Sequence, residues 1–174
     1  MVPRAHIIEW QQYAPWQSNG QIEQDLVIER SLSELFADDL IREKLAFRGG
    51  TALHKIFLKP QVRYSEDIDL VQIEAGDIGQ ILTQIRKRLK FIDSRPRFKT
   101  TLNNNIFTFR FQSEIAPVQP LKLKIEINCR EHYNFLGLKK LSHRVNSSWF
   151  SGNCNIISYV NYSPSLDNFL TKIS

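Results

Sequence analysis

The amino-acid sequence predicts a mixed α/β fold, a small mixed sheet flanked by helices, for a single domain spanning residues 1–174. Two segments, 21–38 and 77–89, carry apolar residues at helical spacing with charged residues on the opposite side. Three others, 63–71, 105–112 and 121–128, alternate apolar and polar residues as half-buried strands do. Because the two kinds of segment are interleaved, the order is typical of a mixed α/β layer.

Five elements are expected in the first half of the chain. In order, they are a short helix and a packing loop within 1–20, a helix over 21–38, a strand over 45–48, a helix over 51–58 and a strand within 63–71. The aromatic residues of the first segment are expected to anchor it to the body of the domain. Pro60 ends the helix over 51–58, because proline cannot continue a helix.

The second half is expected to contain one more full helix and three strands. In order, they are a helix over 77–89, strands over 105–112 and 121–128, an irregular or partly helical stretch over 129–150 and a strand over 154–160. A last helix is expected to begin at Ser163-Pro164, with serine as N-cap and proline at the first helical position. Its apolar stripe continues to Ser174, so we expect the chain to be the front part of a longer protein.

The composition excludes several classes of protein. Lys and Arg number 23 and Asp and Glu 18, so the net charge is +5, a mild excess that is compatible with a polyanionic partner. Cys129 and Cys154 form no CxxC pair, which excludes a disulfide scaffold and a Cys-rich zinc site. There is no apolar run of about 18 residues and no secretory signal, so we expect a cytoplasmic protein without a membrane partner.

A Gly-Gly pair lies between an expected strand and an expected helix. Gly49 and Gly50 have no Cβ atoms, so the backbone there can approach a ligand closely. The following helix points its free N–H groups and the positive end of its dipole at the same place, and the Thr51 hydroxyl adds a donor. The pattern predicts a phosphate site.

The sequence Asp67-Ile68-Asp69 brings two carboxylates together, because residues i and i+2 of a strand share a face. Two such anions are unfavourable side by side unless a cation lies between them, and carboxylate oxygens suit Mg²⁺. Glu126 offers a third carboxylate on the polar face of a later strand. If that strand lies beside the first, the three carboxylates converge opposite the Gly-Gly turn, a geometry that fits two metal ions in phosphoryl or nucleotidyl transfer.

These motifs together resemble the nucleotidyltransferase superfamily with the polymerase-beta-like fold. The string FRGGTALHK at 47–55 with RYSEDIDLV at 63–71 closely resembles the AbiEii/AbiGii toxin family within it. Members of that family are the nucleotidyltransferase halves of abortive-infection, type IV toxin–antitoxin pairs. The resemblance runs from about residue 21 to the C-terminus and is strongest over 45–71.

The resemblance implies roles for particular residues. They are the phosphate-binding glycines Gly49 and Gly50, the metal-binding pair Asp67 and Asp69, the hydroxyl Ser65 near the nucleotide, and Glu126 as third acidic residue and candidate general base. Thr171-Lys172 resembles the start of a helix that brings a lysine to the nucleotide, after which family members continue with a helical C-terminal region. Arg48 and Arg63 flank the motif, where they can neutralise triphosphate charge or pair with Glu66 or Asp67.

The implied function is Mg²⁺-dependent transfer of a nucleoside monophosphate from an NTP to an acceptor, with release of pyrophosphate. The resemblance suggests a tRNA 3′ end or a protein hydroxyl as acceptor, and growth inhibition in phage defence as the outcome. It also suggests a cognate antitoxin from the same operon, a DNA-binding regulator that need not contact the toxin.

Two other readings stay open on the sequence. The chain could be a non-catalytic nucleotide- or RNA-binding module, or a regulatory partner that acts by protein–protein contact. Single features are ambiguous too: Glu126 could form a cross-strand ion pair, the basic segment 86–90 could contact RNA or simply face solvent, and His54 is expected to be a packed or surface residue.

Overall fold

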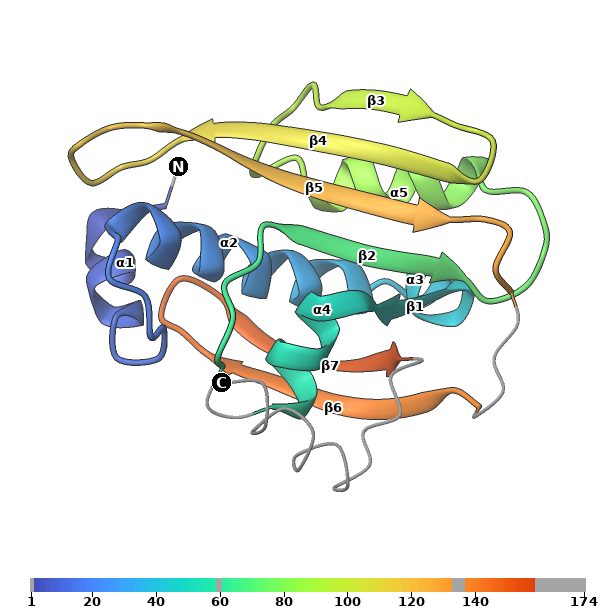
Figure 1. Ribbon diagram of the computed structural model, residues 1–174, viewed down its shortest axis with the longest axis horizontal. Coiled ribbons are helices and arrows are strands. Elements are labelled where there is room, and N and C mark those ends of the chain that lie inside the picture. Colours follow the sequence, from blue (N-terminus) through green and yellow to red (C-terminus); the bar gives the residue numbers. More distant parts are fainter. Residues whose placement is uncertain (1, 59–60, 133–136, 159–174) are drawn as a thin grey trace.

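The computed structural model describes residues 2–58, 61–132 and 137–158. Figure 1 shows one sheet with helices against it. The helices are α1 (Arg4–Trp10), α2 (Asn19–Phe36), α3 (Asp39–Lys44), α4 (Gly49–Ala52), which continues into the π-helical turn η1 (Leu53–Phe57), and α5 (Gly79–Arg88). None of these described helices is long and apolar enough to cross a membrane.

The sheet has seven strands in the order β3-β4-β5-β2-β1-β7-β6. Their bounds are β1 (Leu45–Arg48), β2 (Asp67–Gln72), β3 (Arg97–Thr100), β4 (Asn104–Gln112), β5 (Pro120–Asn128), β6 (Lys139–Asn146) and β7 (Ser151–Ser158). Strands β2 and β5 pair in parallel, as do β1 and β7, whereas the other four pairs are antiparallel. The sheet is therefore mixed, as the sequence predicts.

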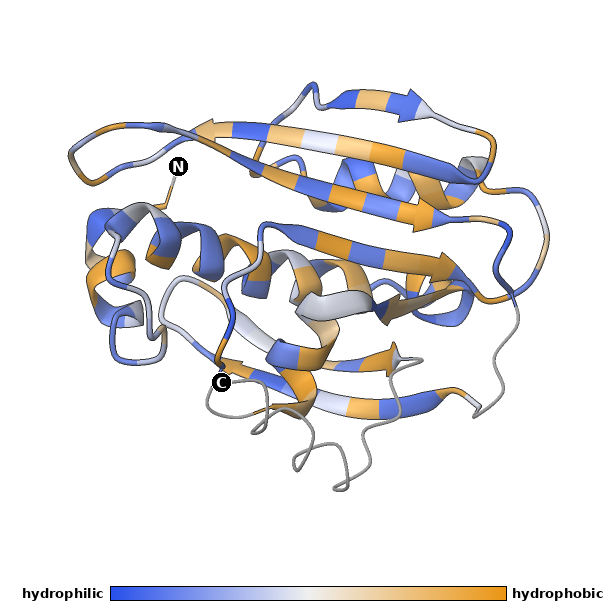
Figure 2. Ribbon diagram, in the orientation of Figure 1, coloured by the Kyte–Doolittle hydropathy of each residue, from blue (hydrophilic) through white to orange (hydrophobic). Residues whose placement is uncertain are grey.

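The core lies between the sheet and α2, because that helix is buried along most of its length. Figure 2 shows the hydrophobic and hydrophilic bands that alternate along β4 and β5. On β4 the inward residues include Phe107 and Phe109, both fully buried, with ring centroids 5.9 Å apart. The same alternation turns Lys122, Lys124 and Glu126 of β5 outward, and this is what places the candidate site on the opposite face.

Several elements differ from the sequence-based expectation. The expectation of an irregular or partly helical stretch over 129–150 is wrong in part, because it contains β6, an edge strand whose exposed residues give no clear alternation. Two short elements were not predicted, β3 and α3. The six-residue α3 is set by its N-cap, where the Asp38 carboxylate accepts a hydrogen bond from the Ile41 amide at 3.2 Å. Strand β2 begins at Asp67, in the middle of the expected range 63–71, and ends at Gln72, one residue beyond it.

Two expectations lie outside the described residues. They are the helix that begins at Ser163 and the Thr171-Lys172 pair within it.

Candidate active site

The pairing of β2 with β5 brings three carboxylates to one face of the sheet. Asp69 is the register partner of Glu126, and Asp67 is the partner of Lys124. Neighbouring strands lie about 4.8 Å apart, so register partners in a parallel pair project side by side. The inward neighbours Ile68 and Ile125 are fully buried, which fixes the outward direction of the acidic residues. The adjacency on which the three-carboxylate argument depends is therefore present.

Gly49 lies directly against the Asp69 carboxylate. Arg48, just before it, is the register partner of Asp69 across the antiparallel pair β1–β2. Gly49 has φ of +80°, and a Cβ atom added to it would lie 2.3 Å from Oδ2 of Asp69. Both the backbone conformation and the contact therefore require glycine. At Gly50, by contrast, a Cβ atom would meet nothing within 4 Å.

This difference predicts that Gly49→Ala damages the site and Gly50→Ala does not damage the fold. Alanine at position 49 must adopt a left-handed conformation, at a cost of about 1–2 kcal/mol, and must also displace the Asp69 carboxylate. We expect a lower midpoint of thermal unfolding and loss of NTP binding for Gly49→Ala. The matched Gly50→Ala should unfold like the wild type. Equal unfolding midpoints and equal NTP binding for the two variants would contradict this account.

A lysine lies among the carboxylates. Nζ of Lys124 is 2.7 Å from Oε2 of Glu126 and 3.9 Å from Oδ2 of Asp67. The other oxygen of Glu126 accepts a hydrogen bond from Nδ2 of Asn104 at 2.5 Å. The sequence left open an ion pair between Glu126 and a neighbouring strand. The ion pair is present, but its cation, Lys124, is on the same strand as Glu126. The i, i+2 spacing puts Lys124 on the same face as Glu126, but its contact with the carboxylates was not predicted.

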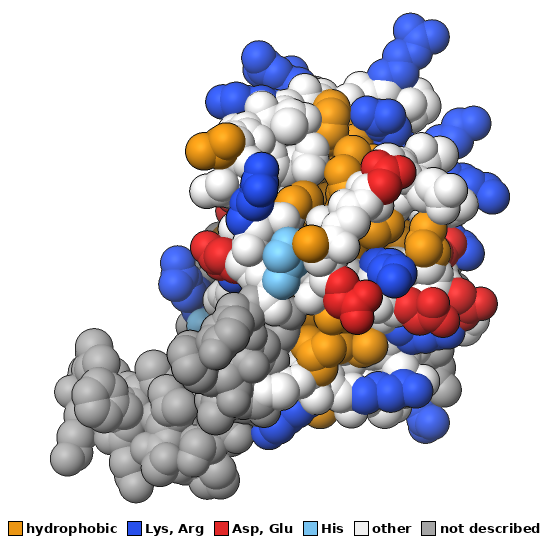
Figure 3. Space-filling model, turned by 90° about the vertical axis from the view of Figure 1, so that its right-hand side faces the viewer, with side chains coloured by type: hydrophobic (Ala, Val, Ile, Leu, Met, Phe, Trp, Pro, Cys, Tyr) orange, Lys and Arg blue, Asp and Glu red, His pale blue; other side chains and the backbone are white. Residues whose placement is uncertain are grey.

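The electrostatics of the site favour a bound cation. Burial raises the pKa of the Asp69 carboxyl above its ordinary value, and the neighbouring carboxylates of Asp67 and Glu126 raise it further; Lys124 and Arg48 act in the opposite direction. The surface shown in Figure 3, at the end toward which β2 and β5 run, mixes acidic, basic and uncharged side chains, so the net charge of +5 is not gathered there.

Thr51 and Ser65 join α4 to the start of β2. Oγ1 of the buried Thr51 donates a hydrogen bond to the carbonyl oxygen of Asp67 at 2.6 Å and is also bonded to Oγ of Ser65. The Thr51 hydroxyl proton is thus directed at the backbone of β2. In this arrangement Thr51 fixes the distance between the Gly-Gly pair and Asp67. The sequence predicts that its hydroxyl donates to a phosphate, but in the structure that hydroxyl donates to the backbone of β2.

The flanking arginines behave differently from each other. Arg48 pairs with Glu131, its Nη1 lying 2.5 Å from Oε2, rather than with Glu66 or Asp67. Arg63 is exposed and makes no ion pair within residues 2–58, 61–132 and 137–158. His54 is half-buried, and burial followed by the charge of Arg63 lowers its pKa. Lys172 is outside the described part of the chain. Of the three cations that the sequence assigns to the nucleotide, Arg48, Arg63 and Lys172, Arg63 is therefore the one that is both described and without an ion pair to a described residue.

A buried ion cluster holds the C-terminal part of the helix formed by α4 and η1, which we call the Gly-Gly helix because it begins at Gly49 and Gly50. Nζ of Lys55, in η1, lies 2.5 Å from Oδ1 of Asp25 and 2.9 Å from Oε1 of Glu29, both on α2. Nε2 of His143 on β6 lies 2.7 Å from Oε2 of the same glutamate. The cluster ties α4 and η1 to α2, so it fixes the direction of the helix that follows Gly49. Sequence reasoning missed it, because a lysine in a short helix reads as solvated.

The donor set of the site suits a hard divalent cation. Asp67 and Asp69 share a face and offer carboxylate oxygens, the ligands that Mg²⁺ prefers. The Asp67 side chain is 42% exposed, so an ion can reach it from solvent. In the described residues, however, no group of three or more His, Cys, Asp and Glu is arranged around one point. Glu126 faces Asn104 and Lys124, so the ready part of the donor set is the pair Asp67 and Asp69.

Within residues 2–58, 61–132 and 137–158, the main hollows are lined by neither Asp67 nor Asp69. The nearest hollow, of about 500 Å³, is lined by Glu66 and Lys122 but by neither Asp67 nor Asp69. Carboxylates on an open face, beside a turn that presents backbone without side chains, can hold a cation and the phosphates of a nucleotide while a large acceptor approaches from above.

Comparison with known proteins places this geometry in a context. Residues 30–159 match the family described as nucleotidyl transferase AbiEii toxin, type IV TA system. No curated protein sequence matches the chain significantly.

Solved structures show the same fold. The crystal structure of JHP933 from Helicobacter pylori has a TM-score of 0.53 at 17% identity and covers 71% of this chain and 50% of its own. MenT4, a nucleotidyltransferase toxin from Mycobacterium tuberculosis, has a TM-score of 0.54 at 14% identity and covers 92% of this chain and 56% of its own. The chain spans about half the length of the solved structures it matches. These likenesses confirm the predicted α/β nucleotidyltransferase fold.

Proposed function

This chain belongs to the AbiEii family of nucleotidyltransferase toxins from type IV toxin–antitoxin systems, and from that premise we propose that it transfers a nucleoside monophosphate from an NTP to a hydroxyl group of an RNA or a protein. The observation that carries the proposal is the register of β2 and β5, which sets Asp69 beside Glu126 with Gly49 against the same carboxylate. A tRNA 3′ end is the RNA acceptor that the resemblance suggests.

The chemistry divides among the residues described. The acceptor hydroxyl oxygen bonds to the α-phosphorus of the NTP, the bond from that phosphorus to the oxygen bridging to the β-phosphate breaks, and pyrophosphate leaves with the electron pair. Gly49 and Gly50 let the triphosphate approach the backbone at the start of α4. Glu126 either takes the hydroxyl proton or completes the cation site. Lys124, which contacts Glu126, would stabilise the negative charge that develops on the phosphates.

Asp67 and Asp69 would hold Mg²⁺, and Glu126 would join them once its contacts with Asn104 and Lys124 give way. When bound, the ion supplies positive charge that neutralises the triphosphate and orients it for in-line displacement. Ser65, Thr51, Arg63 and Lys172 complete the proposed nucleotide site, the first two by positioning β2 and the last two as cations.

The biological role follows from the family. We propose that transfer inhibits growth as part of phage defence. A cognate antitoxin, a DNA-binding regulator from the same operon, would then counteract the effect without needing to contact this chain.

The test is incubation of the purified chain with each labelled NTP, Mg²⁺ and total tRNA, followed by gel analysis, with EDTA as the metal-free control. Label in tRNA that depends on the metal supports an RNA acceptor, and the favoured NTP follows from the same gel. Label in protein supports a protein acceptor. NTP binding without transfer to either would favour a non-catalytic nucleotide-binding module instead.

A further inference from the structure

The strands β3, β4 and β5 have an outward face that carries mainly polar and basic side chains. Arg97, Lys99 and Arg110 are exposed on it. Helix α5 lies on the other face, since the guanidinium of Arg86 stacks 4.9 Å from the ring centroid of Phe98 and 5.2 Å from that of Phe107, both inward residues. In Figure 1, too, α5 and α2 lie together on one side of these strands. The outward face is therefore the face that carries the candidate site.

The strand register joins the basic residues to the carboxylates in rows that run across the sheet. One row consists of Arg97 on β3, Thr108 on β4, Lys124 on β5 and Asp67 on β2. The next row consists of Lys99, Ile106, Glu126 and Asp69 on the same four strands. Each row crosses three strand spacings, about 14 Å at about 4.8 Å per strand. The basic edge of the sheet is thus continuous with the site.

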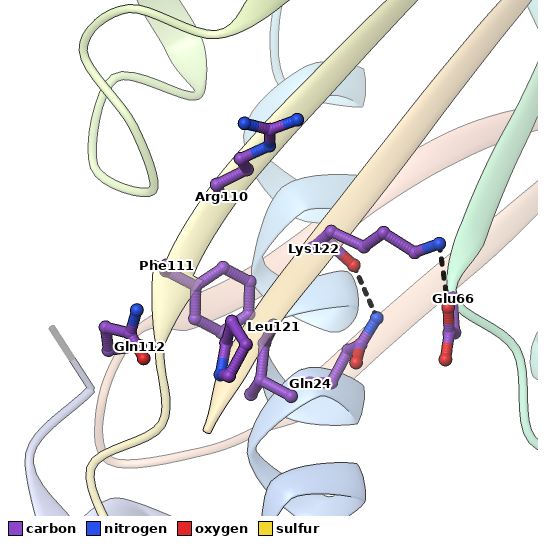
Figure 4. Close-up of a pocket in the computed structure, with 8 residues that line it drawn as sticks. Gln24, Glu66, Arg110, Phe111, Gln112, Leu121 and Lys122 are labelled. Carbon is purple, nitrogen blue, oxygen red and sulfur yellow. Dashed lines mark hydrogen bonds and ion pairs between the residues drawn. The ribbon is translucent and has the colours of Figure 1, made fainter. Parts of the chain in front are cut away.

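A third row lies beside these two. It pairs Arg110 with Lys122, whose Nζ lies 3.8 Å from Oε2 of Glu66 at the entry to β2. Figure 4 shows Arg110 and Lys122 on the adjacent strands, with Lys122 reaching toward Glu66. Two hollows adjoin these rows, one of about 500 Å³ beside Arg110 and Lys122 and one of about 400 Å³ lined by Arg97 and Lys99.

The cations farthest from the carboxylates have no acidic partner. Arg97, Lys99 and Arg110 form no ion pair with any residue that the structure describes. Asp93, the nearest acid in sequence to Arg97 and Lys99, has its carboxylate turned to the backbone amides of Arg95 and Arg110, at 2.8 and 3.2 Å. A solvated cation is ordinary, but these three unpaired cations share the face of the candidate site, and two of them are in register with its carboxylates. Together they form a positive field that leads to the site.

The chemistry of this surface suits a phosphate backbone. We propose that the basic sheet face, formed by Arg97, Lys99, Arg110, Lys122 and Lys124, binds the backbone of a single-stranded RNA acceptor and directs its terminal hydroxyl to Asp67 and Asp69. The inference rests on the proposed nucleotidyl transfer and selects RNA over protein as the acceptor. None of the outward positions of β3, β4 and β5 is aromatic, so this face offers the RNA cations for its phosphates rather than a stacking platform for its bases.

The test compares two triple variants with the same change of charge. Arg97→Ala/Lys99→Ala/Arg110→Ala removes three cations from the basic sheet face. Arg4→Ala/Lys87→Ala/Lys90→Ala removes three exposed cations from α1, from α5 and from the turn after α5, and it also tests the basic segment 86–90 as the rival RNA contact. Binding of fluorescent single-stranded RNA and tRNA is measured by anisotropy over a range of salt concentrations, without NTP, and transfer is measured in parallel.

We expect the sheet-face variant to bind RNA at least about tenfold more weakly at low salt than the wild type. Loss of three phosphate contacts should also reduce the slope of log K against log salt by about 2, since each contact contributes about 0.7 for a single strand. NTP binding should stay at the wild-type level. The α1 and α5 variant should match the wild type in affinity and slope.

Equal losses in the two variants, or no RNA binding by the wild type, would overturn the docking surface. The two proposals fail separately. Unchanged transfer to RNA in the sheet-face variant would reject the surface and leave the transfer function standing. RNA binding that is lost in the sheet-face variant, in a wild type that never transfers nucleotide to any acceptor, would reject the transfer function and keep the surface.

Discussion

Replacement of Asp69 by asparagine is expected to abolish nucleotidyl transfer while leaving the fold at least as stable as that of the wild type. Asp69 shares a strand face with Asp67, is the register partner of Glu126 on β5, and has its carboxylate against Gly49. Asparagine has nearly the same shape but carries no charge, so it cannot hold a divalent ion with Asp67. Because charge stabilisation by a metal is worth several kcal/mol and each 1.36 kcal/mol is a factor of ten, we expect a loss of about 1,000-fold or more.

The stability of the same variant should respond in the opposite direction. Burial and the two neighbouring carboxylates raise the pKa of Asp69 above its ordinary value of 3.8, so the folded chain disfavours the charged form. Asparagine removes this penalty wherever the wild-type carboxyl is ionised, that is, at neutral pH. The gain should vanish as the pH falls below 3.8, where the carboxyl is protonated in both the folded and the unfolded chain.

These expectations are checked by transfer assays and by thermal unfolding at pH 7 and pH 3.5, with and without Mg²⁺. The ion should stabilise the wild type more than Asp69→Asn, since it binds only the folded site. Asp77→Asn is the matched control: this exposed residue accepts a hydrogen bond from the Gly79 amide at 3.0 Å, which asparagine can also do. Undiminished transfer by Asp69→Asn would remove the proposed metal pair.

The sequence predicts the ingredients of the site better than their assembly. Alternation in β2 and β5 correctly places Asp67 and Asp69 on one strand face and Glu126 on the polar face of another. Whether those faces meet depends on which strands are neighbours. The parallel pairing of β2 with β5 joins residues more than 50 positions apart, and no local pattern encodes such a pairing. The pairing is therefore a result of the structure.

The short and exposed elements were missed for a related reason. β3 has four residues and β6 is an edge strand, so neither buries enough side chains to produce an alternating pattern. Lys124 shows the same limit at the level of one side chain. Its face was predictable, but its approach to Asp67 depends on which strand lies beside β5. Lys55 is the clearest case, because the carboxylates that allow its burial come from a helix about 30 residues earlier in the chain.

Replacement of Lys55 by methionine is expected to cost about 3–5 kcal/mol of folding stability, the range for a buried ion pair that loses one partner. Methionine has similar length and fills the same space, so the loss comes from charge rather than from a cavity. Asp25 and Glu29 would be left buried without their cation. For a chain of this size, the midpoint of thermal unfolding should fall by roughly 6–20 °C.

The pH dependence of that loss separates the ion cluster from simple packing. Burial pushes the pKa of Glu29 upward, but the charge of Lys55 and the contact with His143 outweigh it and hold the value at about 2. In the wild type, this contribution to stability is present above pH 4.5 and is lost as the pH falls toward 2. Without Lys55, the largest charge that opposes the effect of burial on the Glu29 pKa is gone. Protonation of Glu29 at low pH should therefore stabilise the Lys55→Met variant, whereas it destabilises the wild type.

Urea unfolding at pH 7 and pH 4, followed by tryptophan fluorescence, measures both effects. One of the three tryptophans, Trp10, lies at the cluster, where its Nε1 donates a hydrogen bond to Asp25 at 2.8 Å. The difference between wild type and Lys55→Met should be smaller at pH 4. The triple variant Lys55→Met/Asp25→Asn/Glu29→Gln removes all three charges and should regain most of the stability, since no unpaired buried ion remains. If Lys55→Met loses the same stability at both pH values and the triple variant regains none of it, Lys55 contributes through its shape, and the Gly-Gly helix is held by packing alone.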